Sequence, residues 1–303
     1  IYLCRFDKLL RIDIRKELFM KTTIITDSAS DLGGEGRGII VIPLTVLLGE
    51  REGADGEITP DDIYAYFAET GRTPKTAAIS PERFERVFAE VTADGGEAVY
   101  ISIASTMSAC YGNARLAAQN YPGVRVVDSG WLSGGIALLA IYAEELAGRG
   151  LGADEIAARV EARKSAVRLS LIVDTMTFLH RGGRCGSLAA FVAGVLKIRP
   201  SIVMTDGKLT VGRKYIGPAR RALTKYAADA LAAADNIDPA YFYLVHTSPK
   251  REILDETEAL IRAARPDANI IERVAGATIT SHTGRGGIAL IYFNDGGNPH
   301  TDE

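Results

Sequence analysis

Short apolar runs that end in hydroxyl-bearing turns recur along the first half of the chain. Three of them are Ile24–Ser28, Tyr100–Ser105 and Val126–Ser129. Turn or helix signals follow each run, an alternation typical of α/β proteins. Ligands of open parallel sheets lie beyond the carboxyl ends of the strands, so we expect these hydroxyls to converge at a ligand crevice, with Ser28 and Ser105 as candidate binding residues. Hydroxyls favour a small polar head such as a carboxylate, although each of them is equally typical of a helix cap.

Proline positions predict further elements of this first part. Ile39–Leu48 is a long apolar run that contains Pro43, which predicts an edge or irregular strand. Thr59-Pro60 and Ser80-Pro81 each place proline directly after an N-cap residue. Because proline fits the first turn of a helix, two helices are expected to begin there.

A glycine-rich break separates two further helices and marks a plausible lobe boundary. The helices are predicted over Gly130–Ala147 and Ala153–Ala166, and the break is Gly148–Gly152. At 303 residues the chain is long for one compact core, so two lobes are expected. We predict a parallel-sheet lobe over residues 20–166 and a smaller lobe over residues 167–303.

The pattern changes from Arg168 onward. Ser201–Thr205 and Lys208–Gly212 flank Asp206-Gly207, which predicts a β-hairpin with a two-residue turn. The other elements predicted here are strands over Leu169–Val173, Tyr241–Val245 and Ile288–Phe293, and helices over Pro218–Ala234 and Pro249–Ala264. Hairpins belong to mixed sheets, so this lobe should be α+β in character.

The first nineteen residues differ from the rest. They mix charged and scattered apolar side chains and lack the small-residue cleavage site of a secretory signal. We expect residues 1–19 to be a peripheral extension and Met20 to be close to the natural start. A short amphipathic helix packed on the body is the alternative.

Composition excludes several classes of function. A formal net charge of -3 gives no footprint for nucleic acid. Cys4, Cys110 and Cys185 form no paired-thiol motif, which predicts a cytoplasmic protein with reduced thiols. The longest apolar stretch, Ile136–Ala143, falls well short of the ~18 residues that span a bilayer. No nucleotide-binding loop is present, since Gly33–Gly38 fails the dinucleotide spacing, so a separate kinase must perform any phosphorylation of a ligand.

A series of short blocks in this sequence resembles the signature blocks of the DegV family, in the family's order. The blocks are Lys21–Asp31, Pro43–Thr45, Lys75-Thr76, Ile103–Ala114, Val127–Ser129, Phe178–Arg184, Leu196–Pro200, Asp206-Gly207 and Ser281–Gly284. The resemblance runs from about Met20 to Phe293. It implies a DegV-like fold, a Rossmann-like lobe followed by an α+β lobe, and binding of a long-chain fatty acid. In bacteria with a fatty acid kinase, members of the family serve as its acyl-carrier subunit.

The resemblance also implies the residues that bind the ligand head. Thr76 matches a threonine that hydrogen-bonds the fatty acid carboxylate, and Ser108 matches a serine that contacts it. Arg184 matches an arginine near the ligand head, and His282 lies in a polar stretch that we expect to be a flexible loop. Each residue has a simpler alternative: a loop residue, a helix cap, a structural ion pair and a structural histidine, respectively.

Several positions depart from the family pattern. Ala77 and Ala78 replace polar neighbours of the threonine, so recognition of the head group is expected to depend more on other residues. Ala109 replaces glycine and Cys110 replaces threonine, a stronger hydrogen-bond donor. Arg285 replaces proline in the stretch after the histidine.

We therefore predict a non-enzymatic carrier, without cofactor or metal, that binds a long-chain fatty acid in an apolar tunnel of the first lobe. It would present the carboxylate to the catalytic subunit of a fatty acid kinase, without stable membrane insertion. The alternatives are a hydrolase or acyltransferase that uses Ser108 or Ser105 with His282, and a small-ketone binder of the dihydroxyacetone-kinase type. Against catalysis, no Gly-x-Ser-x-Gly elbow is present and no acid is evident to orient the histidine.

Overall fold

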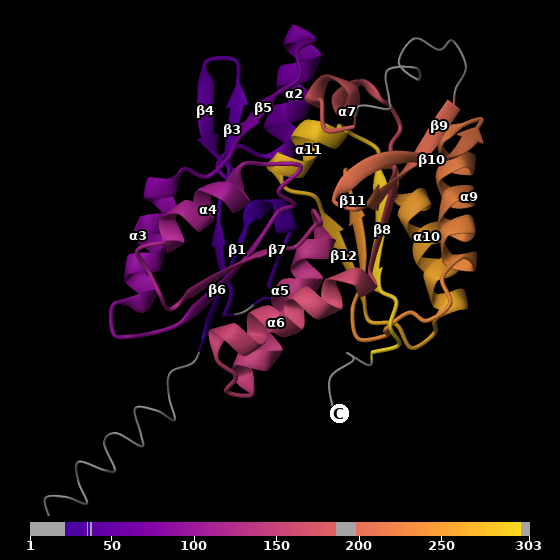
Figure 1. Ribbon diagram of the computed structural model, residues 1–303. Helices are drawn as coiled ribbons and strands as arrows, with labels where there is room; N and C mark the ends of the chain where they lie inside the picture. Colours follow the sequence, from indigo (N-terminus) through magenta and orange to yellow (C-terminus); the bar gives the residue numbers. More distant parts are fainter. Residues whose placement is uncertain (1–21, 35, 37, 186–197, 298–303) are drawn as a thin grey trace, which may run out of the picture.

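A parallel-sheet lobe and a mixed-sheet lobe lie side by side in the computed structural model (Figure 1), as predicted. The structure describes residues 22–34, 36, 38–185 and 198–297. The predicted extension over residues 1–19 and part of the predicted block Leu196–Pro200 lie outside these residues.

The first sheet has four strands, all parallel. In spatial order they are β2 (Ile40–Ile42), β1 (Thr23–Asp27), β6 (Ala98–Ser102) and β7 (Val124–Asp128). All five residues of β6 are buried, because helices cover both faces of this sheet. The strand ends that carry the predicted hydroxyl turns therefore share one edge of the sheet.

The apolar run Ile39–Leu48 forms two strands in different sheets, not one irregular strand. β2 is the predicted edge strand, and β3 (Thr45–Leu48) begins after Pro43. β3 is the centre of a small antiparallel sheet with β4 (Arg51–Ala54) and β5 (Lys75–Ala77). The run divides because Pro43 has no N–H for a sheet ladder and the N–H of Leu44 donates to the Ser28 hydroxyl at 3.0 Å.

Both proline-marked helices begin where predicted. Thr59 caps α2 (Pro60–Thr70) in a capping box with Asp62. α3 (Pro81–Thr92) begins after Ser80, whose side chain makes no cap bond to the backbone. α3 packs with α4 (Cys110–Ala118) on one face of the parallel sheet.

Helix α5 (Gly134–Gly148) lies between the two large sheets and contacts strands of both. Every residue from Gly134 to Ala143 is buried, as expected of a helix packed on both faces. At Gly134 a side chain would come within 3.0 Å of Tyr243 in the second lobe, so glycine permits this close packing. The predicted start at Gly130 is wrong by four residues, because Ser133 has a positive φ angle (φ 52) that a right-handed helix does not contain.

The second lobe is built on a six-stranded mixed sheet, as predicted. In spatial order its strands are β10 (Lys208–Ile216), β9 (Ile198–Thr205), β8 (Val167–Ile172), β13 (Ile288–Phe293), β11 (Phe242–His246) and β12 (Ile270–Val274). β9 and β10 form the predicted hairpin, and Asp206 (φ 48) and Gly207 (φ 71) have the positive φ angles of a type I′ turn.

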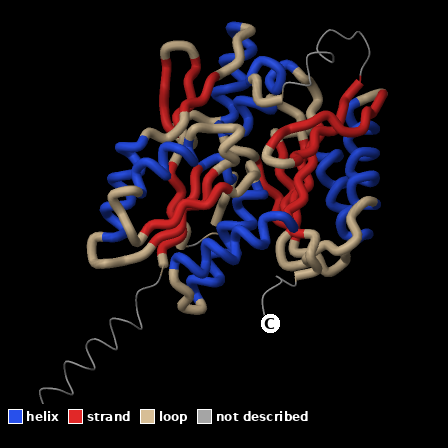
Figure 2. The backbone as a smooth tube through the Cα atoms, viewed as in Figure 1, coloured by secondary structure: helices blue, strands red, loops and turns tan. Residues whose placement is uncertain are grey.

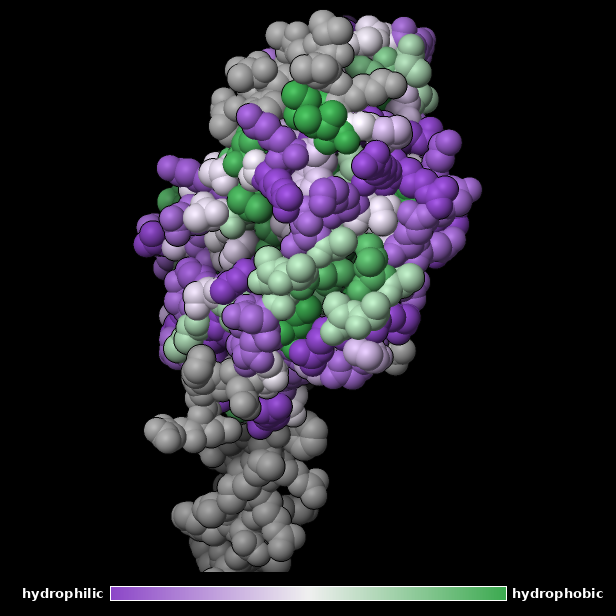
Figure 3. All heavy atoms as spheres, turned by 90° about the vertical axis from the view of Figure 1, so that its right-hand side faces the viewer, coloured by the Kyte–Doolittle hydropathy of each residue, from purple (hydrophilic) through white to green (hydrophobic). Residues whose placement is uncertain are grey.

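Helices complete a layered structure. α6 (Ala153–Arg163) packs beside α5, and α9 (Ala219–Ala232) and α10 (Arg251–Ala264) cover the outer face of the mixed sheet. Figure 2 shows the two larger sheets with helices between and outside them. The outer face in Figure 3 is mainly hydrophilic around a limited hydrophobic patch. Within the described part of the chain, no helix combines the length and apolar character that crossing a bilayer requires.

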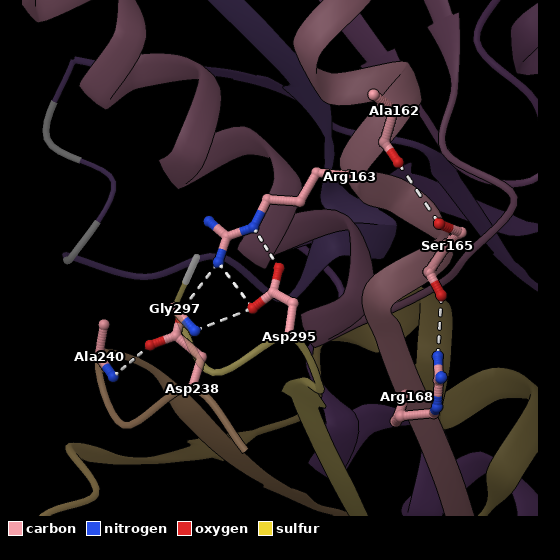
Figure 4. Close-up of polar contacts among 8 residues, drawn as sticks. All are labelled: Ala162, Arg163, Ser165, Arg168, Asp238, Ala240, Asp295 and Gly297. Atoms are coloured by element: carbon pink, nitrogen blue, oxygen red, sulfur yellow. Dashed lines mark hydrogen bonds and ion pairs between the residues drawn. The ribbon is translucent and has the colours of Figure 1, made fainter. Parts of the chain in front are cut away.

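A buried ionic cluster ties the end of α6 to the second lobe (Figure 4). Arg163 pairs with Asp238 at 2.8 Å and with Asp295 at 2.9 Å, and all three side chains are below 10% exposure. The Arg163 guanidinium also lies 3.8 Å from the ring centroid of Phe293. β8 begins at Val167, and the proposed boundary between residues 166 and 167 stays a prediction.

Candidate functional site

A largely apolar cavity of about 240 Å³ lies between the two lobes. One water needs only about 10–15 Å³, so the space suits a larger guest. Its apolar lining comes from both lobes: Leu44, Ala78, Ile103, Met107, Ala109, Leu132, Leu171, Leu179, Leu209 and Ile279. The cavity is thus shared between the lobes, whereas the sequence predicted a tunnel within the first.

Four of the six predicted site residues line this cavity. Thr76 lies on β5, Ser108 precedes α4, Arg184 follows α7 (Thr177–Gly182), and His282 lies on α11 (Ala277–Thr283). Four segments far apart in sequence therefore bring a cation, an imidazole and two hydroxyls to one otherwise apolar space.

His282 occupies the last turn of a helix, so the prediction of a flexible loop at this position is wrong. The flanking Gly276 and Gly284 bound α11, and the glycine-rich stretch begins only after it. Figure 1 shows this helix between α2 and the mixed sheet. A histidine on a packed helix is held more firmly than one on a loop, which suits a binding group that must keep its geometry.

The environment of His282 keeps its imidazole neutral. Burial, followed by the positive charge of Arg184, lowers its pKa from 6.5 to about 4. Nε2 lies 2.9 Å from the Thr76 hydroxyl, whereas Nδ1 is buried and has no hydrogen-bond partner among the described residues. An unpaired buried N–H is costly, so we infer that the proton sits on Nε2 and is donated to Thr76. The Thr76 hydroxyl proton is then free to donate to a ligand.

Ser108 serves the helix start as well as the cavity. Its oxygen accepts the backbone N–H of Cys110, the first residue of α4, at 3.3 Å, and its hydroxyl lies 3.2 Å from the Cys110 sulfur. Burial raises the pKa of the Cys110 thiol to about 11, so the sulfur stays protonated at neutral pH. The hydroxyl can exchange this weak sulfur contact for a ligand carboxylate at little cost.

The remaining two predicted residues lie elsewhere. Ser28 accepts the N–H of Leu44 and lies 3.5 Å from the hydroxyl of Thr278, so it borders the cavity lining without forming it. Ser105 lines a separate cleft of about 1040 Å³, and its N–H donates to Asp128. The strand-end hydroxyls therefore converge only in part.

Sequence reasoning missed Thr278 and Ile279 of α11, which line the cavity beside His282. Their β-branched side chains are poor helix formers, so the local pattern did not predict a helix here. The available signal was the pair of glycines that bounds the segment, Gly276 and Gly284.

The geometry does not support a hydrolase. A catalytic histidine is typically oriented by a third group at its second nitrogen, and among the described residues Nδ1 of His282 has no hydrogen-bond partner. Nε2 is bonded to Thr76 and not to Ser108. The described part of the chain also holds no group of three metal-ligating side chains.

These features define a two-lobed α/β protein with an apolar ligand cavity that is polar at one point. The chain belongs to the DegV family: the family model "Uncharacterised protein, DegV family" matches residues 21–295. The DegV domain-containing protein TTE1491 of Caldanaerobacter subterraneus is 29% identical over 280 residues, which cover 90% of this chain and 98% of that protein.

Solved structures share the fold. The fatty-acid-binding DegV family protein from Thermus thermophilus has a TM-score of 0.83 at 29% identity, over 91% of this chain and 100% of that chain. The DegV lipid-binding protein from Thermotoga maritima has a TM-score of 0.76 at 25% identity, over 91% and 99%. The fatty acid kinase B3 protein of Streptococcus pneumoniae, loaded with linoleic acid, has a TM-score of 0.78 over 91% and 100%; at 22% identity this likeness concerns the fold alone.

Proposed function

We propose that this protein binds a long-chain fatty acid in the cavity between the lobes. The observation that carries the proposal is the convergence of Thr76, Ser108, Arg184 and His282 on an otherwise apolar cavity. Fatty acid binding by the Thermus thermophilus relative supports the same ligand class.

The chemistry of the site suits a carboxylate in particular. Thr76 and Ser108 supply hydroxyl donors, and the exposed Arg184 supplies a fixed positive charge. Burial of about fourteen methylenes at ~0.8 kcal/mol each gives a gross driving force on the order of 10 kcal/mol before ordering costs. Burial of the acyl chain sets affinity, and the polar groups set its orientation.

The ligand would remain chemically unchanged until a separate fatty acid kinase phosphorylates its carboxylate. This step rests on the family resemblance and on the absence of a nucleotide-binding loop from the sequence. Arg184 is exposed and donates to the Gly182 carbonyl at 2.7 Å, so its charge is accessible at the cavity. We propose that it stabilises negative charge as the phosphoryl group arrives.

Mass spectrometry of organic extracts from the purified full chain tests the binding proposal. We expect co-purified fatty acid, because an empty apolar cavity would otherwise be dry or poorly hydrated. Native mass spectrometry after addition of palmitate or oleate provides the second measurement. Protein that stays ligand-free in both measurements would contradict the proposal.

Arg184→Ala tests the carrier role separately. Palmitate affinity should stay within about tenfold, whereas acyl-phosphate formation with a fatty acid kinase should fall much further. Equal losses in both assays would make Arg184 an ordinary ligand contact. No acyl phosphate from the wild-type protein and any fatty acid kinase tested would refute the carrier role while leaving binding intact.

A further inference from the structure

Helix α11 depends on its surroundings for its position. It has seven residues, and helices shorter than ~12 residues are marginal on their own. Thr278, Ile279, His282 and Thr283 of this helix all line the cavity. Whatever fixes its first turn therefore also fixes four groups of the candidate site.

Two carboxylates of the first lobe accept the backbone N–H groups at the start of α11. Asp31 accepts from Gly276 at 2.7 Å. Asp55 accepts from Ala277 at 2.8 Å and from Thr278 at 3.0 Å. The first N–H groups of a helix have no partner within it, so these side-chain oxygens satisfy them and fix the helix more firmly than its own propensity does.

Of the two residues, Asp31 also makes a hydrogen bond to the residue that precedes α5. Its second oxygen accepts the hydroxyl of Ser133 at 2.5 Å. Both residues are almost fully buried, at 6% and 2% exposure, and both have positive φ angles, of 53° and 52°. Such conformations cost energy outside glycine and persist where surrounding contacts enforce them. Asp31 thus joins the turn that follows β1, the start of α5 and the start of α11.

We propose that Asp31 is a positioning residue of the candidate site: by holding Gly276 and Ser133 together, it fixes α11 so that His282 reaches Thr76. Asp31 does not line the cavity, so it acts on the ligand only through the helix. The expected effect of Asp31 on ligand affinity rests on the proposed function. Its expected effect on the position of His282 is independent of that function.

The protonation of Asp31 makes an informative substitution available. Burial is the largest cause that raises its pKa to about 7; Asp55 raises it further, and Ser133, Gly276 and Arg273 oppose this. Asparagine resembles the protonated carboxyl group. Its oxygen can accept from Gly276 and its amide can donate to Ser133, and it tolerates a left-handed backbone.

The experiment measures the pKa of His282 by NMR in lipid-free full-length protein, and then palmitate affinity. Asp31→Ala should move this pKa from about 4 toward 6.5 and weaken palmitate binding about tenfold or more. Asp31→Asn should stay within about twofold of the wild-type affinity, because both hydrogen bonds are retained. A folded Asp31→Ala variant with the wild-type pKa of His282 would overturn the proposal.

Asp238→Ala is the matched control. Asp238 is also buried and accepts a backbone N–H, that of Ala240 at 2.9 Å, but it lies in the Arg163 cluster. The Asp238→Ala substitution should lower the stability of the protein without changing the pKa of His282. If Asp31→Ala does not fold, Ser133→Ala replaces it, because it removes one of the two side-chain hydrogen bonds of Asp31 described above. NMR ring resonances of His282 that shift from their wild-type positions would support the proposal, and unshifted resonances would overturn it. If wild-type protein binds no palmitate, the proposed function fails. The NMR measurement of the His282 pKa still decides whether Asp31 positions α11.

Discussion

Burial of an imidazole beside a hydroxyl gives His282 a protonation behaviour that can be measured directly. Its folded-state pKa lies near 4, below the ordinary 6.5, so the folded protein binds fewer protons than the unfolded chain between these values. The stability that this group contributes is therefore complete above pH 6.5 and decreases as pH falls toward 4. Asp27 and Asp31, with pKa values raised to about 6 and about 7, act in the opposite sense, because their contribution decreases as pH rises through these values.

A bound carboxylate should raise the pKa of His282, because an opposite charge favours the imidazolium. We expect NMR titration to give a higher pKa in palmitate-loaded protein than in lipid-free protein, and ¹⁵N spectra of the lipid-free protein to show the proton on Nε2. By linkage, binding should then strengthen as pH falls between the two pKa values. The same pKa in both forms would place the carboxylate elsewhere.

Ser108→Ala should weaken palmitate binding by roughly 1–2 kcal/mol, because one hydrogen bond to a charged group is lost while the apolar cavity remains. Isothermal titration measures the change. Ser165→Ala is the control: this exposed serine donates its hydroxyl to the Ala162 carbonyl (Figure 4) and does not line the cavity, so affinity should be unaffected. Unaltered affinity in the Ser108 variant would leave this residue as the helix-start contact described above.

Among the elements, α7 and α11 meet so closely that a single methyl group would disturb the site. A β-carbon at Gly182 would lie 2.5 Å from Nδ1 of His282. Gly182→Ala should therefore displace one helix, lower stability by about 1–3 kcal/mol and weaken palmitate binding. Thermal unfolding and titration measure both effects.

Gly112→Ala is the matched control for that substitution. Gly112 lies inside α4, and a β-carbon there would meet nothing within 4 Å. Alanine should raise stability by about 0.5–1 kcal/mol, because glycine loses more backbone entropy on folding. Destabilisation of equal size in both variants would show that the contact with His282 is not the cause.

How far the elements could be predicted depended on whether their signals were local. Prolines and caps marked the starts of α2 and α3, and Asp206-Gly207 marked the hairpin. Helix α11 was missed because its β-branched residues disfavour a helix, and carboxylates distant in sequence hold it in place. Hydroxyl motifs and family blocks indicated Thr76 and Ser108, whereas the assembly of one cavity from both lobes depends on tertiary packing that no local pattern encodes.

At the scale of the molecule, α5 and the Arg163 cluster make the two lobes one packed body. The largest buried cluster runs from Ile24 in the first lobe to Phe293 in the second, through the residues of α5. A cavity between the lobes keeps its shape only while they stay packed. Affinity for a fatty acid should therefore depend on contacts that lie far from the cavity.

Arg163→Ala tests this dependence. Its loss leaves Asp238 and Asp295 buried without their cation, so stability should fall by about 3–5 kcal/mol. Arg262→Ala is the control: it removes an exposed pair with Glu258 inside α10, for which about 0.3–0.5 kcal/mol is expected. On the proposed function palmitate binds the packed state and not the unfolded chain, so saturating ligand should raise the unfolding temperature of every variant and restore much of what the Arg163 variant loses. If ligand raised the unfolding temperature of the Arg262 variant but not that of the Arg163 variant, the Arg163 cluster would be required to form the cavity, not merely to stabilise it.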